Sequence, residues 1–176
     1  MTPAEFTQKW KHSPIVKFRL PAQASEGLSC CSASVLREYG LPQTAEPWLS
    51  FMEFVPTDRL TPLDAQGLFP IGCLANGSCI CIEKQSDRLV IFDPNEPDEL
   101  WALNSSLEAL YESMVIFASF IEEVNRRNPN YNSNFKIPDG MLSELKEKLT
   151  ACDSEAMAAK GYWYCEIGVL DDSSVM

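Results

Sequence analysis

The segment Leu103–Val124, LNSSLEALYESMVIFASFIEEV, decides the fold that the sequence predicts. Its large apolar residues recur at helical spacing for about five turns. They are Leu107, Leu110, Tyr111, Met114, Phe117, Ile121 and Val124. Ser105 followed by Glu108 has the form of a capping box, and Asn104 is an alternative cap. We therefore expect one long amphipathic helix over about 105–127, whose apolar stripe another layer must cover.

The chain before this helix is rich in short β-like runs. The pattern predicts strands near residues 67–74, 78–83, 88–92 and 100–103. Asn76-Gly77 is a turn signal between the first two strands, and Lys84–Asp87 is a hairpin-length connection between the next two. Because parallel strands need long crossovers, these short links predict an antiparallel meander. Trp48–Val55 is a candidate for a further strand.

Shorter elements flank this centre. Helices are expected from Thr2 to about His12, over 29–39 and over 139–149, and a brief strand or extended arm over 15–19. Residues 130–134 read as a polar loop, and 153–160 begins like a helix. Residues 161–170 fit either a helix or a strand. The sequence as a whole predicts a single α+β domain over residues 1–176, with helices flanking an antiparallel sheet.

The composition limits the classes of partner. The chain carries 25 acidic and 14 basic residues, for a net charge of −11. Such a charge repels nucleic acid and anionic membranes and attracts basic partners. No run approaches the roughly 18 apolar residues of a membrane span, and no export signal is evident. With seven cysteines and no export signal, we expect a cytoplasmic protein with reduced thiols.

The usual catalytic and metal-binding patterns are missing. His12 is the sole histidine and is predicted to lie on the surface, so no imidazole is at hand to activate a nucleophile. The sequence has no Gly-x-Ser-x-Gly elbow. Cys79 and Cys81 lie too close together for an ordinary zinc knuckle, and core packing explains them better. We therefore predict no catalytic residue, no cofactor and no metal ligand.

One acidic loop is the best candidate for a contact surface. The stretch Asp93–Glu99, DPNEPDE, contains four carboxylates and two prolines but lacks the EF-hand pattern. It can be a solvated turn, a partner-contact surface or a metal site. If it contacts a partner, the candidate binding residues are Asp93, Glu96, Asp98 and Glu99, together with Glu83 on a neighbouring strand. The tryptophans Trp48, Trp101 and Trp163 are expected in the core.

Five segments in this order resemble the SUKH superfamily, and most closely its fourth subfamily. They are Gly40–Pro42 (GLP), Leu68–Gly72 (LFPIG), Ser78–Glu83 (SCICIE), Arg88–Phe92 (RLVIF) and Leu103–Leu107 (LNSSL). The resemblance covers about residues 28–127 and rests on the order and spacing of the set. It implies an α+β fold with an antiparallel sheet, no catalytic site, and a role in binding and neutralising a protein toxin.

Charge and resemblance together suggest a mechanism. A toxin that degrades nucleic acid presents a basic cleft, and long-range attraction steers an acidic protein to it. The alternatives are a regulatory or scaffold protein of the same superfamily that binds a housekeeping partner, and a metallohydrolase that uses the Asp93–Glu99 carboxylates. The sequence gives no indication of whether the chain self-associates.

Overall fold

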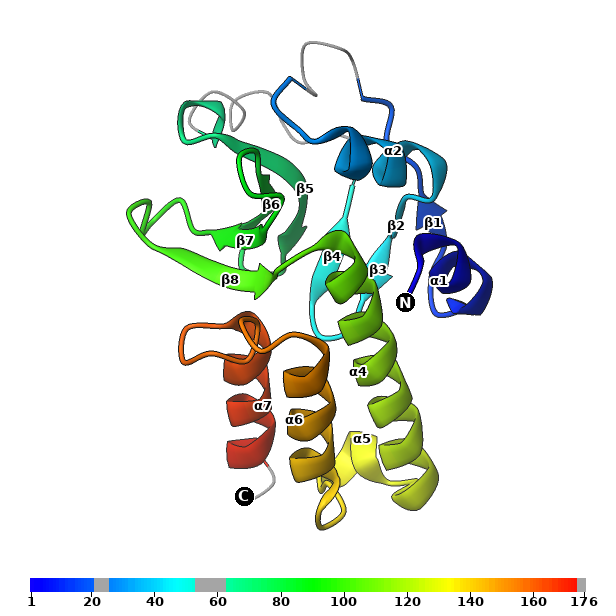
Figure 1. Ribbon diagram of the computed structural model, residues 1–176. Coiled ribbons are helices and arrows are strands. Elements are labelled where there is room, and N and C mark those ends of the chain that lie inside the picture. Colours follow the sequence, from blue (N-terminus) through cyan, green and yellow to red (C-terminus); the bar gives the residue numbers. More distant parts are fainter. Residues whose placement is uncertain (21–25, 53–62, 174–176) are drawn as a thin grey trace.

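A six-stranded antiparallel sheet forms the upper part of the molecule (Figure 1). The computed structural model describes residues 1–20, 26–52 and 63–173. The strands follow one another in chain order across the sheet, so each pairs with its neighbour in sequence. They are β3 (Thr44–Ala45), β4 (Leu49–Phe51), β5 (Leu68–Leu74), β6 (Cys79–Glu83), β7 (Leu89–Phe92) and β8 (Leu100–Asn104). A separate two-stranded sheet pairs β1 (Ile15–Val16) with β2 (Leu41–Pro42).

The predicted meander is confirmed. All five strand pairs of the large sheet are antiparallel, and the four strands β5 to β8 lie where the sequence placed them. The candidate strand Trp48–Val55 is shorter, because β4 comprises only Leu49–Phe51 among the described residues. The end of that candidate, from residue 53, lies outside the described part of the chain.

The long helix α4 (Leu107–Arg127) packs on the sheet and extends well beyond it (Figure 1). Six of the seven apolar positions that predicted its stripe are buried, and Ile121 is half-buried. They share one core with sheet residues such as Ile80, Ile82 and Ile91. The amphipathic pattern thus identified both the helix and the face that it buries.

The start of α4 differs from the predicted capping box. Ser106 is the N-cap, and its Oγ accepts a hydrogen bond from the backbone N–H of Ala109 at 3.1 Å. Asn104 instead ends β8, with its side chain buried, and the Ser105 N–H donates to Asp153 at 2.7 Å. Both predicted caps were wrong because a carboxylate from the distant Asp153 engages these two residues.

The N-terminal helices are close to their predicted positions. α1 (Pro3–Lys9) begins with a complete capping box between Thr2 and Glu5. α2 (Cys30–Glu38) begins at the N-cap Ser29 and is followed by Gly40 in the left-handed region, at φ 75°. A Cβ on Gly40 would lie 2.2 Å from the carbonyl oxygen of Val16, so only glycine allows this close approach.

The C-terminal part is entirely helical in its regular elements. α6 (Met141–Cys152) was predicted, and it lies beside both α4 and α7 (Tyr162–Ser173) (Figure 1). α7 resolves the open choice at 161–170 in favour of a helix. Two expectations were wrong: the predicted loop 130–134 contains the short helix α5 (Tyr131–Asn134), and 153–160 forms turns.

The opposite face of the sheet has its own small core. It consists of Leu63, Leu68, Cys79, Cys81, Val90 and Phe92. Both cysteines are buried, as expected from packing, and burial raises the pKa of the Cys81 thiol far above its usual range. β7 is therefore buried on both faces, which explains its uninterrupted apolar sequence LVIF.

Candidate partner-binding site

A small hollow lies where the β5–β6 turn, the β7–β8 loop and α7 meet. Its volume is about 180 Å³. The residues that line it are Leu74, Asn76, Ser78, Ile91, Asp93, Glu96, Trp101, Tyr162, Cys165 and Glu166. It thus combines three carboxylates with the rings of Trp101 and Tyr162, and we call it the acidic hollow. Two of its carboxylates, Asp93 and Glu96, belong to the acidic loop identified from the sequence.

The β7–β8 loop is organised by hydrogen bonds of its own. The Oδ1 of Asp93 accepts from the backbone N–H and the side-chain amide of Asn95, at 2.9 and 3.0 Å. Backbone N–H groups of Glu96 and Glu99 donate to the carbonyls of Asp93 and Glu96, both at 3.0 Å. The loop is therefore a structured turn, and it holds exposed carboxylates in fixed places.

Not all five predicted contact residues lie together. Asp98 and Glu99 are exposed on the same loop, and Glu99 pairs with Lys160 at 3.4 Å. Glu83 lies at the end of β6 that is remote from the loop. The opposite end of this strand, at Cys79, pairs with Phe92, which precedes the loop. Glu83 is half-buried and accepts a hydrogen bond from Ser86 in the β6–β7 turn. A partner centred on the loop would reach Glu83 only by covering the length of β6.

Glu166 is the site residue that sequence reasoning missed. It lies on α7, and burial raises its pKa to about 7. Burial is the only cause of the shift, so no neighbouring cation of the described chain offsets the desolvation of this carboxylate. No sequence signal pointed to it, because residues 161–170 could not be assigned to a helix or a strand.

A second hollow, of about 450 Å³, lies on the other side of the β5–β6 turn. Ala75 lines this hollow, whereas its neighbours Leu74 and Asn76 line the acidic one. The other residues that line it are His12, Thr44, Ala45, Glu46, Trp48, Leu49 and Ser50. We call it the Trp48 hollow. His12 is exposed, as predicted, and its Nε2 lies 3.7 Å from a carboxylate oxygen of Glu122.

Trp48 itself is not in the core, which corrects the prediction. Its side chain is 65% exposed, whereas Trp163 is fully buried and Trp101 is half-buried. The backbone of Trp48 is left-handed, at φ 62°, in the β3–β4 turn. Its neighbours Pro47 and Leu49 are buried, so the turn directs this one ring outward.

A buried polar network fixes the elements behind the acidic hollow. The Asn104 amide nitrogen donates to Ser113 Oγ and to Asp153 Oδ2, both at 3.1 Å. Its oxygen accepts from the indole Nε1 of Trp163 at 3.0 Å. This network joins β8 to α4 and to the start of α7 and so sets the relative positions of Trp101 and Glu166. Sequence reasoning treated Asn104 as a possible helix cap and as part of the LNSSL segment, and it did not predict this network.

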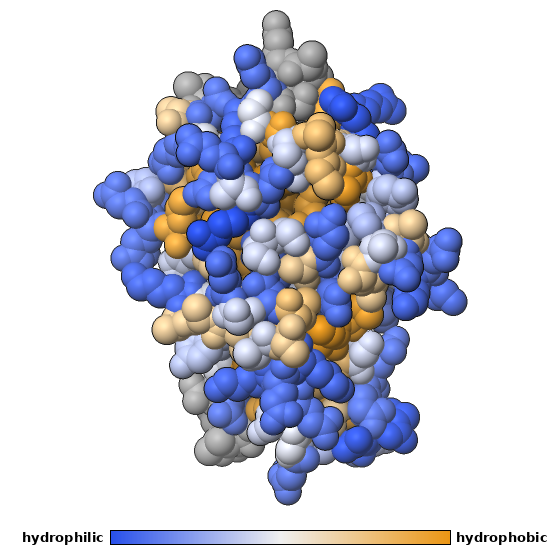
Figure 2. All heavy atoms as spheres, in the orientation of Figure 1, coloured by the Kyte–Doolittle hydropathy of each residue, from blue (hydrophilic) through white to orange (hydrophobic). Residues whose placement is uncertain are grey.

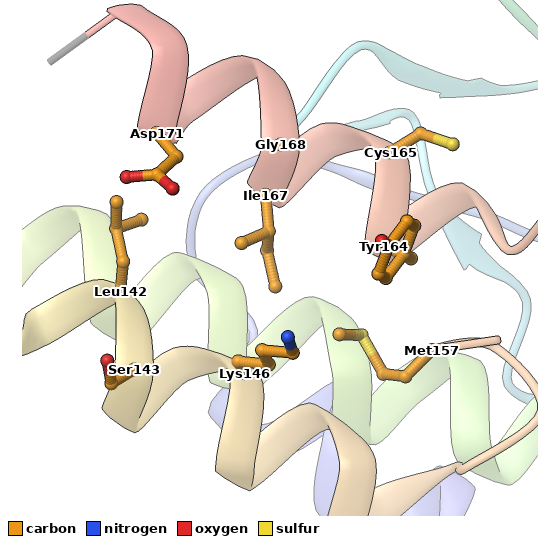
Figure 3. Close-up of a pocket in the computed structure, with 9 residues that line it drawn as sticks. All are labelled: Leu142, Ser143, Lys146, Met157, Tyr164, Cys165, Ile167, Gly168 and Asp171. Carbon is orange, nitrogen blue, oxygen red and sulfur yellow. The ribbon is translucent and has the colours of Figure 1, made fainter. Parts of the chain in front are cut away.

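A third groove, between α6 and α7, has a different character (Figure 3). Its volume is about 380 Å³, and Leu142, Met157 and Ile167 supply most of its apolar lining. The Lys146 ammonium lies over the Tyr164 ring, 5.9 Å from its centroid. Because the ammonium of Lys146 is part of the groove lining, this groove suits a basic partner less well than the acidic hollow does.

Metal binding finds no support within residues 1–20, 26–52 and 63–173. Among these residues, no group of three or more histidine, cysteine, aspartate or glutamate side chains is arranged to hold an ion. The hydropathy of the surface is mixed: Figure 2 shows hydrophilic residues over most of one face, with hydrophobic residues between them. None of the described helices is both long and apolar enough to cross a membrane.

The fold and the acidic hollow together define a small α+β protein with a carboxylate-lined hollow at its surface. The chain belongs to the SUKH-4 immunity protein family, which matches residues 12–171. This membership supports a role in toxin immunity and suggests a non-catalytic protein. The match also extends beyond the expected 28–127 and includes helix α6 and most of α7. No curated protein and no solved structure matches the chain.

Proposed function

We propose that this protein neutralises a protein toxin by binding it, and that the toxin is a basic effector of the cytoplasm, such as a nuclease. The observation that carries this proposal is the acidic hollow, in which carboxylates of the β7–β8 loop meet a half-buried glutamate of α7. Family membership supplies the biological setting of toxin immunity. The net negative charge of this chain complements a nucleic-acid-degrading enzyme, because the active-site cleft of such an enzyme must be basic.

Binding alone suffices for such a function. A chain of net charge −11 is attracted to a basic cleft over distances of about 10 Å at moderate salt. The exposed carboxylates Glu96, Asp98 and Glu99 would strengthen this attraction at the rim of the interface. Occupying the cleft then denies the toxin its anionic substrate, without any bond being made or broken.

The direct experiment is co-expression with a candidate toxin domain taken from a neighbouring gene. We expect the cells to survive when the protein is present, and a one-to-one complex to persist through gel filtration. The variant Glu147→Gln should protect the cells as the wild type does, because Glu147 is exposed on α6 and does not line the acidic hollow. Cell death in the presence of folded protein, with no complex on the column, would refute the proposal.

A carboxylate-based metallohydrolase is tested separately. The purified chain is analysed for zinc, manganese and calcium by mass spectrometry of the metal content. Stoichiometric metal that survives dialysis would oppose a purely binding role. Loss of that metal in Glu96→Gln would place it at the β7–β8 loop.

A further inference from the structure

The two hollows adjoin at the β5–β6 turn, where Ala75 lines the Trp48 hollow and its chain neighbours Leu74 and Asn76 line the acidic hollow. We infer that this surface is the toxin-binding site: the acidic hollow receives one arginine or lysine side chain of the toxin, while Trp48 packs against the toxin surface beside it. This inference rests on the proposed function and adds the place and chemistry of the contact. We call the surface the two-hollow face.

The hollows are held together by contacts within the chain. The hydroxyl of Tyr162, which lines the acidic hollow, donates a hydrogen bond to the carbonyl oxygen of Pro47, next to Trp48. Leu49 pairs with Leu74, so β4 also joins the β3–β4 turn to β5 beside the acidic hollow. The two hollows therefore keep a fixed spacing, which a rigid partner can match.

Trp48 has the properties of an interface anchor. An indole ring that is 65% exposed leaves a large apolar area in water, and covering it releases about 25 cal/mol per Å². Its left-handed backbone, at φ 62°, is unfavourable for any residue with a Cβ by about 1–2 kcal/mol. Tryptophan is enriched among the residues that dominate binding energy at interfaces.

The charge of the acidic hollow selects the partner group. The hollow brings together Asp93 and Glu96 from the loop and Glu166 from α7, and no lysine or arginine of the described chain lines it. The titratable groups of α7 beside Glu166 are Tyr162 and Cys165, and burial raises the pKa of each, so both are neutral near pH 7. An incoming cation would meet only neutral groups and carboxylates.

Arginine fits this hollow for a second reason. Its guanidinium can donate to a carboxylate while its plane stacks on an aromatic ring, and Trp101 and Tyr162 supply rings in the wall. The cation would also favour the ionised form of Glu166, whose pKa burial has raised to about 7. Binding should therefore release protons near neutral pH, and it should weaken as Glu166 is protonated.

The first test measures, by calorimetry, binding to the toxin domain that the co-expression experiment identifies. We expect Trp48→Ala and Glu166→Gln each to weaken binding by about tenfold or more. The controls are Phe135→Ala, at an exposed aromatic residue with φ 51° that caps the C-terminus of α5, and Glu147→Gln. Circular dichroism verifies that all four variants are folded. If the four bind alike while the wild type still forms the complex, this inference fails and the proposed function stands.

The second test needs no toxin. Nα-acetyl-arginine amide and its neutral citrulline counterpart are titrated into the ¹⁵N-labelled full-length protein. We expect arginine, and not citrulline, to shift the Trp101 indole resonance together with the amides of Asn76 and Glu166, and Glu166→Gln to weaken the effect. Equal shifts with both compounds, or no shift with either, would overturn the inferred cation-binding pocket. If no toxin complex forms but arginine binds specifically, the proposed function fails while the pocket remains.

Discussion

Replacing Asp153 with alanine should destabilise the protein strongly, although Asp153 is far from the predicted contact surface in sequence. Its side chain is 5% exposed. One carboxylate oxygen accepts from the Asn104 amide at 3.1 Å and from the Ser105 N–H at 2.7 Å. The other oxygen accepts from the N–H groups of Glu155 and Ala156, at 3.2 and 3.4 Å. A single carboxylate thus connects β8, the start of α4 and the turn after α6.

The size of the effect follows from these four bonds. A hydrogen bond to a charged group contributes about 1.5–3 kcal/mol, and leaving a buried donor unsatisfied costs about 1–3 kcal/mol. The two short bonds to Asn104 and Ser105 dominate, while the longer pair at the turn adds less. Removing the buried charge offsets part of the loss, because its own desolvation is no longer required. We expect Asp153→Ala to lower the free energy of unfolding by about 3–5 kcal/mol.

Urea-induced unfolding, followed by near-ultraviolet circular dichroism, is the appropriate assay. The fully buried Trp163, whose indole N–H binds Asn104, should supply a strong tertiary signal. Ser113→Ala provides a graded control, because it removes the neutral hydrogen bond from Asn104 at 3.1 Å and a weaker one with Cys152 Sγ at 3.7 Å, and it should cost about 1 kcal/mol. In a double-mutant cycle that combines Asp153→Ala with Asn104→Ala, we expect a coupling energy of about 1–3 kcal/mol between the two side chains.

The reasoning would be refuted if Asp153→Ala lost less than about 1 kcal/mol, or if its effect and that of Asn104→Ala simply added. Either result would mean that the carboxylate does not hold the three elements together. The network would then be a consequence of the fold and not a cause of its stability.

Three further predictions concern single positions and the whole surface. Burial raises the pKa of Glu166 in the folded protein to about 7, so the stability that this residue contributes at low pH is lost as pH rises through 7. Urea unfolding should therefore show Glu166→Gln to be more stable than the wild type by about 1 kcal/mol near pH 8 and equally stable near pH 4. Gly40→Ala should destabilise the protein by about 2 kcal/mol or more, because the added Cβ would meet the Val16 carbonyl, whereas Gly168→Ala, at an open position of α7, should stabilise it by about 0.5–1 kcal/mol. Equal effects of the two variants on thermal unfolding would contradict this prediction. Association with the toxin domain should slow by about tenfold or more between about 50 and 500 mM salt in stopped-flow fluorescence, and a salt-independent rate would exclude electrostatic steering.

Much of the fold could be predicted because its signals are local. The stripe of α4 repeats over many turns, and short polar links between apolar runs leave an antiparallel meander as the simplest arrangement. The ends of elements were less predictable because distant residues decide them. Asn104, Ser105 and Ser106 are all good caps, and Asp153, which binds the first two, decides between them.

The candidate site was predictable only in part. The acidic loop at Asp93–Glu99 was evident from composition, but the hollow beside it also needs Glu166 from α7, in a stretch that fitted a helix and a strand equally well. Trp48 was assigned to the core because most tryptophans are buried, whereas its exposure depends on the left-handed turn between β3 and β4. Neither feature follows from residue type.

The most direct test of this account is calorimetric titration of a candidate toxin domain from a neighbouring gene into the purified protein near pH 7, in two buffers of different ionisation enthalpy. We predict a one-to-one complex whose apparent enthalpy differs between the buffers, because the cation that enters the acidic hollow displaces a proton from Glu166. No heat of binding, together with no complex on a sizing column, would contradict the claim that this protein acts by holding a toxin.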